Sequence, residues 1–210
     1  MAGGRGMRLM PLTKEISKAM VQINGVSLIS YSLQQLKEVI PHIMITVGYK
    51  GSDLAKHVIE HGVSAIFNTD GKGNAWWLFN TLMKHLNEPV LVLTCDNIVK
   101  LNMSFLQQNY YWLNAPPCMV VPVRPVEGIE GDYIYGKDSI VHTMSRETPT
   151  EIYCSGIQVI NPFMINKMVK ECDDFYHVWE RLILHKQLYY STVYPERWHT
   201  VNTIRNLNYI

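Results

Sequence analysis

The sequence has little of several features that would narrow its function. Its formal net charge is only +1, from 19 Lys and Arg against 18 Asp and Glu, which gives no electrostatic footprint for binding DNA or RNA broadly and leaves a local anion site possible. No apolar run approaches the roughly 18 residues of a membrane-spanning helix, and residues 1–6 lack the apolar core of a signal peptide. Four cysteines without a C-x-x-C pair argue against a disulfide scaffold or a zinc knuckle, and indicate reduced thiols in a cytoplasmic protein.

Short β-branched runs alternate with amphipathic stretches along the chain. The runs predict strands at 43–47, 63–67, 90–94, 118–123 and 157–160, and apolar spacings of three and four predict helices within 28–40, 75–86, 106–113 and 178–185. This alternation is typical of βαβ crossovers, so we expect a single α/β domain over residues 1–210 with a mostly parallel central sheet flanked by helices. Residues 124–153 are rich in turn formers and predict a small β-hairpin insertion.

Three glycines lie within four positions near the start of the chain, at Gly3, Gly4 and Gly6. Because glycine has no Cβ, such a loop lets backbone N–H groups converge on an anion. Arg8 adds a planar guanidinium suited to phosphate oxygens. A phosphate-binding loop normally follows a strand, and that strand is expected to be missing before Met1. Taken alone, the glycines fit a flexible terminus as well as a phosphate loop.

A longer pattern surrounds this loop. Residues 3–13, then Ser17-Lys18, then residues 21–29 closely resemble the signature of the sugar-1-phosphate nucleotidyltransferases, which reads G-G-x-G-T-R-L-x-P-L-T, P-K and N-G-x-P-L-I. Met7 replaces the usual threonine and Ser17 the usual proline. Further similar segments follow in the family's order at 73–78, 94–97, 153–162 and 198–203. The resemblance covers nearly the whole chain and implies a Rossmann-like nucleotidyltransferase fold.

The resemblance also implies a reaction. An oxygen of a sugar-1-phosphate, or of a similar small alcohol phosphate, would attack the α-phosphorus of a nucleoside triphosphate and release pyrophosphate, with Mg²⁺ as cofactor. The nucleotide sugar formed would feed polysaccharide or glycoconjugate synthesis, and a homo-oligomer is compatible with the family. Arg8 would neutralise the pyrophosphate, Lys18 would meet a reacting phosphate, and Asp96, at a strand end, would bind the Mg²⁺ together with Asn202.

Further site residues follow from the same resemblance. The nucleotide would contact Ala2, Gly3, Gly4, Gly6, Asn68, Gly73 and Asn74, and the acceptor would contact Arg146, Ser155 and Gly156, with Glu147 as an alternative to Arg146. The pair Trp76-Trp77 is interpreted as one core and one boundary residue. Glu130 and Asp132 are interpreted as solvated hairpin carboxylates.

Three alternatives stay open. The family usually has an acid two residues after the tryptophan, where this chain has Thr200, a residue that on its own would be a solvent-facing loop position. A nucleotide- or sugar-phosphate-binding protein with weakened or lost catalysis is therefore one alternative. A cytidylyltransferase acting on a non-sugar phosphate such as phosphocholine is another. The third is a zinc hydrolase, because His57-Val58-Ile59-Glu60-His61 matches H-x-x-E-H, although a solvated amphipathic helix ending at Gly62 explains the motif better.

Overall fold

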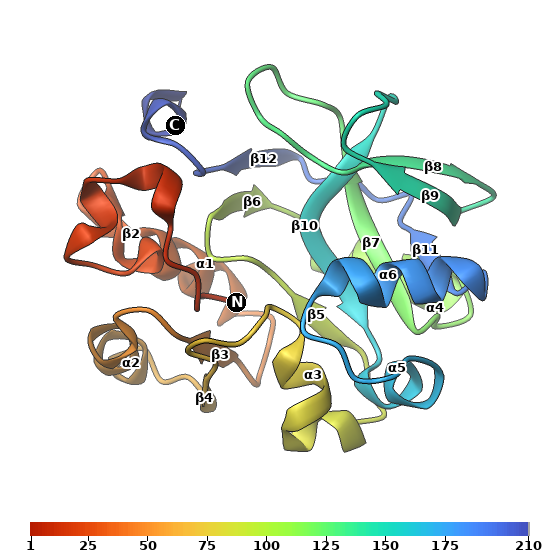
Figure 1. Cartoon of the computed structure of the whole chain (residues 1–210), viewed down its shortest axis with the longest axis horizontal. Coiled ribbons are helices and arrows are strands. Elements are labelled where there is room, and N and C mark those ends of the chain that lie inside the picture. Colours follow the sequence, from red (N-terminus) through yellow and green to blue (C-terminus); the bar gives the residue numbers. More distant parts are fainter. Residues whose placement is uncertain (210) are drawn as a thin grey trace. The chain divides into compact units, whose positions relative to one another are not determined.

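Short strands and helices alternate along residues 1–209, the part of the chain that this computed structural model describes (Figure 1). The strands are β1 (Gln22–Ile23), β2 (Val26–Ser27), β3 (Met44–Val47), β4 (Ala65–Asn68), β5 (Val90–Val92), β6 (Asn97–Lys100), β7 (Cys118–Val123), β8 (Tyr133–Lys137), β9 (Ile140–Ser145), β10 (Tyr153–Ile160), β11 (Leu188–Tyr190) and β12 (Arg197–Thr200). The α-helices are α1 (Leu28–Leu36), α2 (Gly51–Glu60), α3 (Trp76–Asn80), α4 (Met103–Trp112), α5 (Pro162–Met168) and α6 (Phe175–Leu184). Short 3₁₀ helices form η1 (Met7–Leu9), η2 (Leu12–Lys14), η3 (Lys18–Met20), η4 (Leu82–His85) and η5 (Ile204–Tyr209).

Contacts within the chain group its residues into two compact units. Unit 1 comprises Met1–Lys72, Thr94–Val99 and the chain from His199 onward. Unit 2 comprises Gly73–Leu93 and Lys100–Trp198. The chain therefore passes between the units more than once, and the single domain expected over residues 1–210 stays a prediction.

Unit 1 contains a parallel strand pair joined by a helix, as the alternating pattern predicts. β3 and β4 pair in parallel from Met44 opposite Ala65 to Val47 opposite Asn68, and α2 connects them. The opening residues run beside this pair, since the Ala2 amide donates to the Thr46 carbonyl at 3.1 Å. On the other side, the Cys95 amide donates to the Met1 carbonyl at 2.9 Å. Residues 1–3 thus lie between β3 and Cys95 and lead directly into the glycine loop.

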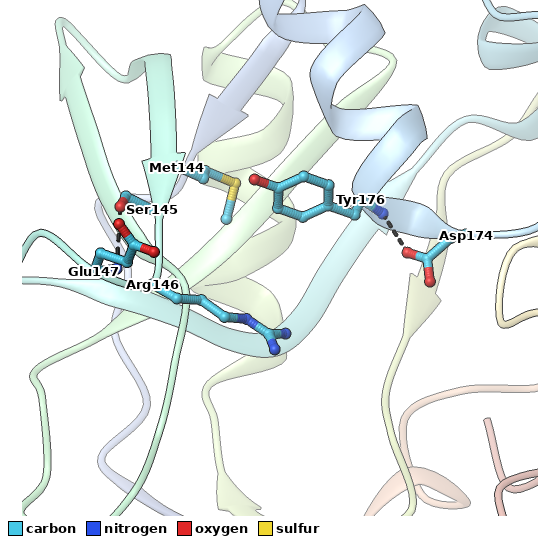
Figure 2. Close-up of a pocket in the computed structure, with 6 residues that line it drawn as sticks. All are labelled: Met144, Ser145, Arg146, Glu147, Asp174 and Tyr176. Carbon is cyan, nitrogen blue, oxygen red and sulfur yellow. Dashed lines mark hydrogen bonds between the residues drawn. The ribbon is translucent and has the colours of Figure 1, made fainter.

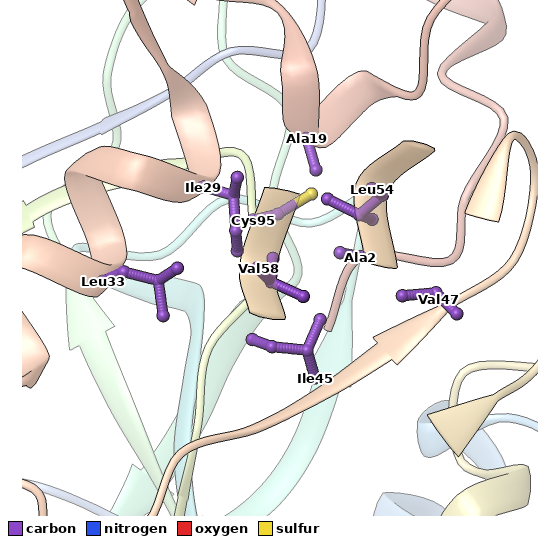
Figure 3. Packing of buried hydrophobic residues seen from close by; sticks show 9 residues of the cluster. All are labelled: Ala2, Ala19, Ile29, Leu33, Ile45, Val47, Leu54, Val58 and Cys95. Carbon is purple, nitrogen blue, oxygen red and sulfur yellow. The ribbon is translucent and has the colours of Figure 1, made fainter. Parts of the chain in front are cut away.

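The core of unit 1 is built from the inner faces of its helices and β3. Figure 3 shows the cluster, whose side chains point toward one another: Ala2, Ala19, Ile29, Leu33, Ile45, Val47, Leu54, Val58 and Cys95. Leu54 and Val58 are fully buried and one helical turn apart, which is the spacing that gives α2 its apolar face. Burying an aliphatic side chain of this size stabilises the fold by about 1.5–3 kcal/mol.

Unit 2 is organised around a sheet with strand order β5-β10-β7-β11-β9-β8. β7 and β11 run parallel, but β10 is antiparallel to both β5 and β7, and β9 is antiparallel to β8 and β11. The expected α/β class is confirmed, whereas the expected parallel order is wrong for most of this sheet. The reason is connectivity: β10 follows the β8–β9 hairpin without the helical crossover that a parallel neighbour needs. In unit 2, α6 contacts β9 and β11.

Local sequence signals explain most helix boundaries. Side chains of Ser27, Asn102, Asn161 and Asp174 accept backbone N–H groups at the starts of α1, α4, α5 and α6. The helix predicted within 75–86 from its apolar spacing is wrong beyond Asn80, because α3 ends there and Thr81 adopts extended backbone angles before η4. Leu82, expected on the buried face, is therefore 85% exposed.

Within residues 1–209, no helix has the length and apolar character needed to span a bilayer.

The four cysteines are free thiols, and three of them are buried. Burial raises the pKa of Cys95 to about 11 and that of Cys154 to about 12, and it raises the pKa of Cys118 well above its ordinary value. These thiols are therefore protonated at neutral pH and behave as small core residues, as the sequence predicts for Cys95 and Cys154.

Candidate active site

Lys18 joins two distant segments of unit 1. Its Nζ donates to Asp96 Oδ2 at 2.5 Å and to Asn202 Oδ1 at 2.8 Å. Lys18 begins η3, Asp96 directly precedes β6, and Asn202 follows the end of β12 by two residues. A backbone hydrogen bond from Val201 to the Asp96 carbonyl, 2.9 Å long, fixes the last two segments to each other. The fold thus brings together three predicted site residues that are 78 and 184 positions apart.

The carboxylate of Asp96 is largely buried and stays ionised. Its side chain is only 15% exposed, and burial alone would raise its pKa. The Lys18 ammonium, through its charge and its hydrogen bond, does most to hold the pKa of Asp96 below its ordinary value. Asp96 Oδ1 is buried without a hydrogen-bond partner among the described residues. One carboxylate oxygen therefore lacks the hydrogen bond or cation that a buried acceptor normally has.

This donor set fits Mg²⁺. The ion prefers hard oxygen ligands and is usually held by one or two carboxylates, with waters and phosphate oxygens completing the shell. Asp96 offers a carboxylate with an unpartnered buried oxygen, and Asn202 offers an amide oxygen bound to the same lysine. The Lys18 ammonium contacts both oxygens, so Asp96 Oδ2 and Asn202 Oδ1 face one cationic group.

The loop that carries Asn202 is held by polar side chains. Asn202 Nδ2 donates to Thr200 Oγ1 at 3.3 Å, which leaves Oδ1 facing Lys18. Asn206 Oδ1 accepts the backbone N–H groups of Asn202 and Thr203 and the Thr203 hydroxyl at 2.8–3.2 Å. Thr200 is 5% exposed at the end of β12, so its interpretation as a solvent-facing loop residue is wrong.

The glycine loop packs against Lys18. Gly6 has φ +64° and precedes η1, and the Thr13 hydroxyl donates to its carbonyl at 2.9 Å. A Cβ on Gly6 would lie 2.9 Å from Lys18 Cβ, closer than real Cβ contacts, whereas a Cβ on Gly4 would meet nothing within 4 Å. Gly6 is therefore needed both for its backbone angles and for the approach of Lys18. The exposed Arg8 lies in η1, directly after this turn.

Ala2, Gly3 and Asn68 are placed near this loop but differ in what they offer. The Ala2 side chain is buried in the core and its N–H is used by Thr46, so neither is left for a nucleotide. The Gly3 carbonyl accepts the Tyr49 amide at 3.2 Å. Asn68 ends β4 with an exposed side chain, whose Oδ1 accepts the Asp70 amide at 3.0 Å.

Gly73 and Asn74 belong to unit 2, where both hold the start of α6. A Cβ on Gly73 would lie 2.0 Å from the Asp173 carbonyl oxygen, so the backbones can approach only because this residue is glycine. Asn74 Oδ1 accepts the Phe175 amide at 2.8 Å. In the neighbouring tryptophan pair, Trp77 is 5% exposed and Trp76 is half-buried, which confirms the interpretation as one core and one boundary residue.

Arg146 lines an open pocket of unit 2. Figure 2 shows this pocket, of about 460 Å³, which is lined by Met144, Ser145, Arg146, Glu147, Asp174 and Tyr176. Arg146 Nε donates to Asp132 Oδ1 at 2.8 Å, and this hydrogen bond raises the pKa of Arg146. Asp132 is 15% exposed in its side chain, so the expectation of a solvated carboxylate is wrong for it.

Ser155 and Gly156 shape β10. Gly156 has φ +80° and lies where the pairing of β10 with β7 shifts register, between Cys154 and Gln158. Ser155 Oγ donates to the Val121 carbonyl at 2.7 Å and accepts the Ile157 amide at 3.1 Å. The Ser155 carbonyl accepts Trp198 Nε1 at 3.1 Å. The Ser155 side chain is thus committed to the sheet, and backbone groups are what this segment can offer.

Residues 1–127 match the sequence profile of the nucleotidyl transferase family. The chain belongs to the nucleotidyl transferase family. A UTP–glucose-1-phosphate uridylyltransferase of Haloferax volcanii is 30% identical over 172 residues, which are 77% of this chain and 70% of the relative. A choline-phosphate cytidylyltransferase of Streptococcus pneumoniae is 28% identical over 182 residues, 84% of this chain and 75% of the relative.

A solved structure supports the fold of this nucleotidyl transferase. The CTP:phosphocholine cytidylyltransferase of Streptococcus pneumoniae superposes with a TM-score of 0.76 at 22% identity, covering 99% of this chain and 94% of that one. The predicted resemblance, the fold and the enzyme class are thereby confirmed.

One residue of the candidate site was missed by sequence reasoning. Asn206 orders the Asn202 loop, and amide-centred networks of this kind have no spacing rule, so no sequence signal pointed to it. The sequence marked Thr200 only as the residue in place of the family's acid, and the structure shows that it orients the Asn202 amide. The zinc-hydrolase alternative has lost support, because a catalytic zinc takes three protein ligands and residues 1–209 contain no group of three His, Cys, Asp or Glu side chains that could hold a metal.

Proposed function

We propose that this chain transfers a nucleotidyl group from a nucleoside triphosphate to a sugar-1-phosphate in the presence of Mg²⁺, releasing pyrophosphate and forming a nucleotide sugar. The observation that carries the proposal is the Lys18 ammonium held between Asp96 Oδ2 and Asn202 Oδ1, beside the glycine loop. Family membership supplies the reaction class, and the uridylyltransferase relative supports a sugar phosphate as the acceptor. Such a product is a donor for polysaccharide synthesis.

The bond changes define what the site must do. An oxygen of the acceptor phosphate forms a bond to the α-phosphorus, and the bond from the α-phosphorus to the oxygen of the leaving pyrophosphate breaks. Negative charge therefore grows on the pyrophosphate, and cations placed there in advance lower the barrier. Lys18 is a mobile point charge that can exchange Asp96 for a phosphate oxygen. Arg8 would present its guanidinium to the pyrophosphate, and N–H groups of the Gly3–Gly6 loop would contact the triphosphate.

Asp96 and Asn202 would hold the Mg²⁺. When bound, this ion neutralises phosphate charge next to the reacting phosphorus. Asp96 is suited to the task because its lowered pKa keeps it ionised at neutral pH, and because its buried Oδ1 has no hydrogen-bond partner in the described chain. Thr200 would keep the Asn202 amide oxygen directed toward the same place.

Further contacts to the base and to the acceptor are proposed from the family motifs. Asn68, Gly73 and Asn74 would contact the nucleotide. Because Asn74 Oδ1 already accepts a backbone N–H, its Nδ2 is the group that would face a base. Arg146 in its pocket, with backbone groups of Ser155 and Gly156, would contact the acceptor. Arg146→Gln should then raise KM for the acceptor more than KM for the nucleotide.

A second candidate is binding without turnover. Thr200 and Asn202 provide no second carboxylate, so less of the triphosphate charge is offset than in a site with two acids.

A third candidate is the same reaction with a different acceptor, which the phosphocholine relative supports.

One assay distinguishes these functions. The full chain is incubated with Mg²⁺, each common nucleoside triphosphate and, in turn, glucose-1-phosphate, mannose-1-phosphate and phosphocholine, and pyrophosphate and product mass are recorded. We expect release with a sugar-1-phosphate, its loss in EDTA, and a fall of about 10²- to 10³-fold in Asp96→Asn. Asp138→Asn, in an exposed turn, is the matched control and should keep full activity. Release with phosphocholine alone would replace the acceptor, and nucleotide binding without release under any pairing would establish the binder.

A further inference from the structure

The H-x-x-E-H segment leaves a polar cluster that the proposed reaction does not use. His57 and His61 lie one turn apart at the end of α2, with ring centroids 4.5 Å apart. Ser27 and Ser30, at the start of α1, face them. Both serines are nearly buried, and both histidines are half-buried, so water can reach the rings.

The tautomer of His61 follows from one contact. Its Nδ1 lies 2.9 Å from the His57 carbonyl, which can only accept, so Nδ1 carries the proton and Nε2 carries a lone pair in the neutral ring. A ring N–H donated to a backbone carbonyl is also the usual way in which a metal-binding histidine is oriented. The Nε2 of His61 is therefore prepared for a ligand on the side of α1.

Both Nε2 atoms converge on one hydroxyl. Ser30 Oγ lies 2.9 Å from His57 Nε2 and 3.4 Å from His61 Nε2, and Ser27 Oγ lies 3.3 Å from His57 Nε2. Bonds of 2.0–2.1 Å in tetrahedral zinc sites place neighbouring ligand atoms about 3.3 Å apart. The distances from Ser30 Oγ to the two Nε2 atoms are thus close to those between neighbouring ligand atoms of one zinc ion.

We propose that His57 and His61 bind one Zn²⁺ ion through their Nε2 atoms, next to the hydroxyl of Ser30, with water completing the coordination. The site has two imidazoles and no carboxylate ligand, so it differs from the oxygen site at Asp96 in both chemistry and residues. Because Ser30 is on α1 and the histidines are on α2, the ion would link two helices of unit 1 and stabilise it.

Calorimetry with ZnCl₂ on the full chain in the Asp96→Asn background tests the site without interference from the oxygen ligands. We expect one equivalent to bind, and affinity to fall at least about tenfold in His57→Gln and in His61→Gln. His42→Gln, an exposed histidine outside the cluster, should bind like the parent, and circular dichroism should show that each variant is folded. Unchanged affinity in either cluster variant would overturn the proposal.

A measurement on the wild-type chain covers the case in which a variant does not fold. The chain has eight histidines. One equivalent of Zn²⁺ should shift the imidazole resonances of two of them, assigned as His57 and His61. Shifts confined to other histidines would refute the site.

Discussion

The side-chain amide of Asn202 donates to the hydroxyl of Thr200 over 3.3 Å. This contact determines which end of the amide faces Lys18, because Nδ2 is engaged and Oδ1 accepts from the ammonium at 2.8 Å. A threonine in the place of the family's acid thus has a role of its own, which is to direct a neutral oxygen toward Asp96 and Lys18.

Thr200→Val tests that role by replacing the hydroxyl with a methyl group of similar size. A net hydrogen bond contributes about 1 kcal/mol, which predicts a loss of about fivefold in kcat with little change in KM. Thr200→Ser, which keeps the hydroxyl, should restore most of the rate. Equal losses in both variants would point to packing rather than to orientation of the amide.

Lys18→Met should lower the transfer rate by about 10²- to 10³-fold, because a preorganised cation is lost. It should also raise the pKa of Asp96, since burial is then no longer opposed by the ammonium. In the wild type the lowered pKa gives stability that is present above the unfolded-state value of about 3.9 and is lost as pH falls through the folded-state pKa.

In Lys18→Met the sign reverses, and the unfolding free energy should increase as pH falls through the raised pKa of Asp96. Urea unfolding at a series of pH values measures this slope. Lys100→Met serves as the control, because Lys100 pairs with Glu196 on the surface, with side chains 73% and 53% exposed. The same pH slope in both variants would contradict the assigned coupling.

Gly6→Ala should impair the site more than Gly4→Ala. The first substitution forces an L side chain to φ +64° and pushes a Cβ to 2.9 Å from Lys18 Cβ, whereas the second meets no atom within 4 Å. We expect a cost of about 1–3 kcal/mol in unfolding free energy for Gly6→Ala, with a marked loss of activity, and near-neutral behaviour for Gly4→Ala. Thermal unfolding and the pyrophosphate assay measure the two effects.

Thiol labelling checks the core. Cys95, Cys118 and Cys154 are buried, and Cys172 is half-buried. The native protein should therefore react with a disulfide reagent at pH 8 mainly through Cys172, and all four thiols should react in denaturant. Fast native labelling of Cys95 would contradict its place in the unit 1 core.

Sequence patterns predicted those elements whose local signal is strong. The apolar run 118–123 became β7 with the same bounds, and the spacing of Leu106 and Tyr110 became the buried face of α4. The pattern failed at Leu82, where Thr81 ends the helical turn and caps the next one. The strands β6, β11 and β12 are too short for an alternation of apolar and polar residues to be detected in the sequence.

The candidate site was likewise predicted only in part from the sequence. Family motifs pointed to Lys18, Asp96 and Asn202, and the structure brings their side chains together. The residues that orient them could not be found in this way, since Asn206 acts through hydrogen bonds formed only after the chain has folded. The antiparallel course of β10 was equally hidden, because it depends on the route of the chain and not on residue type.

Cys95 and Asp96 are consecutive residues with opposite surroundings. The thiol is packed among Ala2, Ile29 and the other apolar side chains of Figure 3, and the adjacent carboxylate binds Lys18. Because only one peptide unit separates the two side chains, the packing of Cys95 in the apolar core determines where the Asp96 carboxylate lies. A larger side chain at residue 95 should displace the Asp96 carboxylate before it unfolds the protein. One substitution at this position therefore measures both how much volume the apolar core tolerates and how strongly turnover depends on the position of the acid.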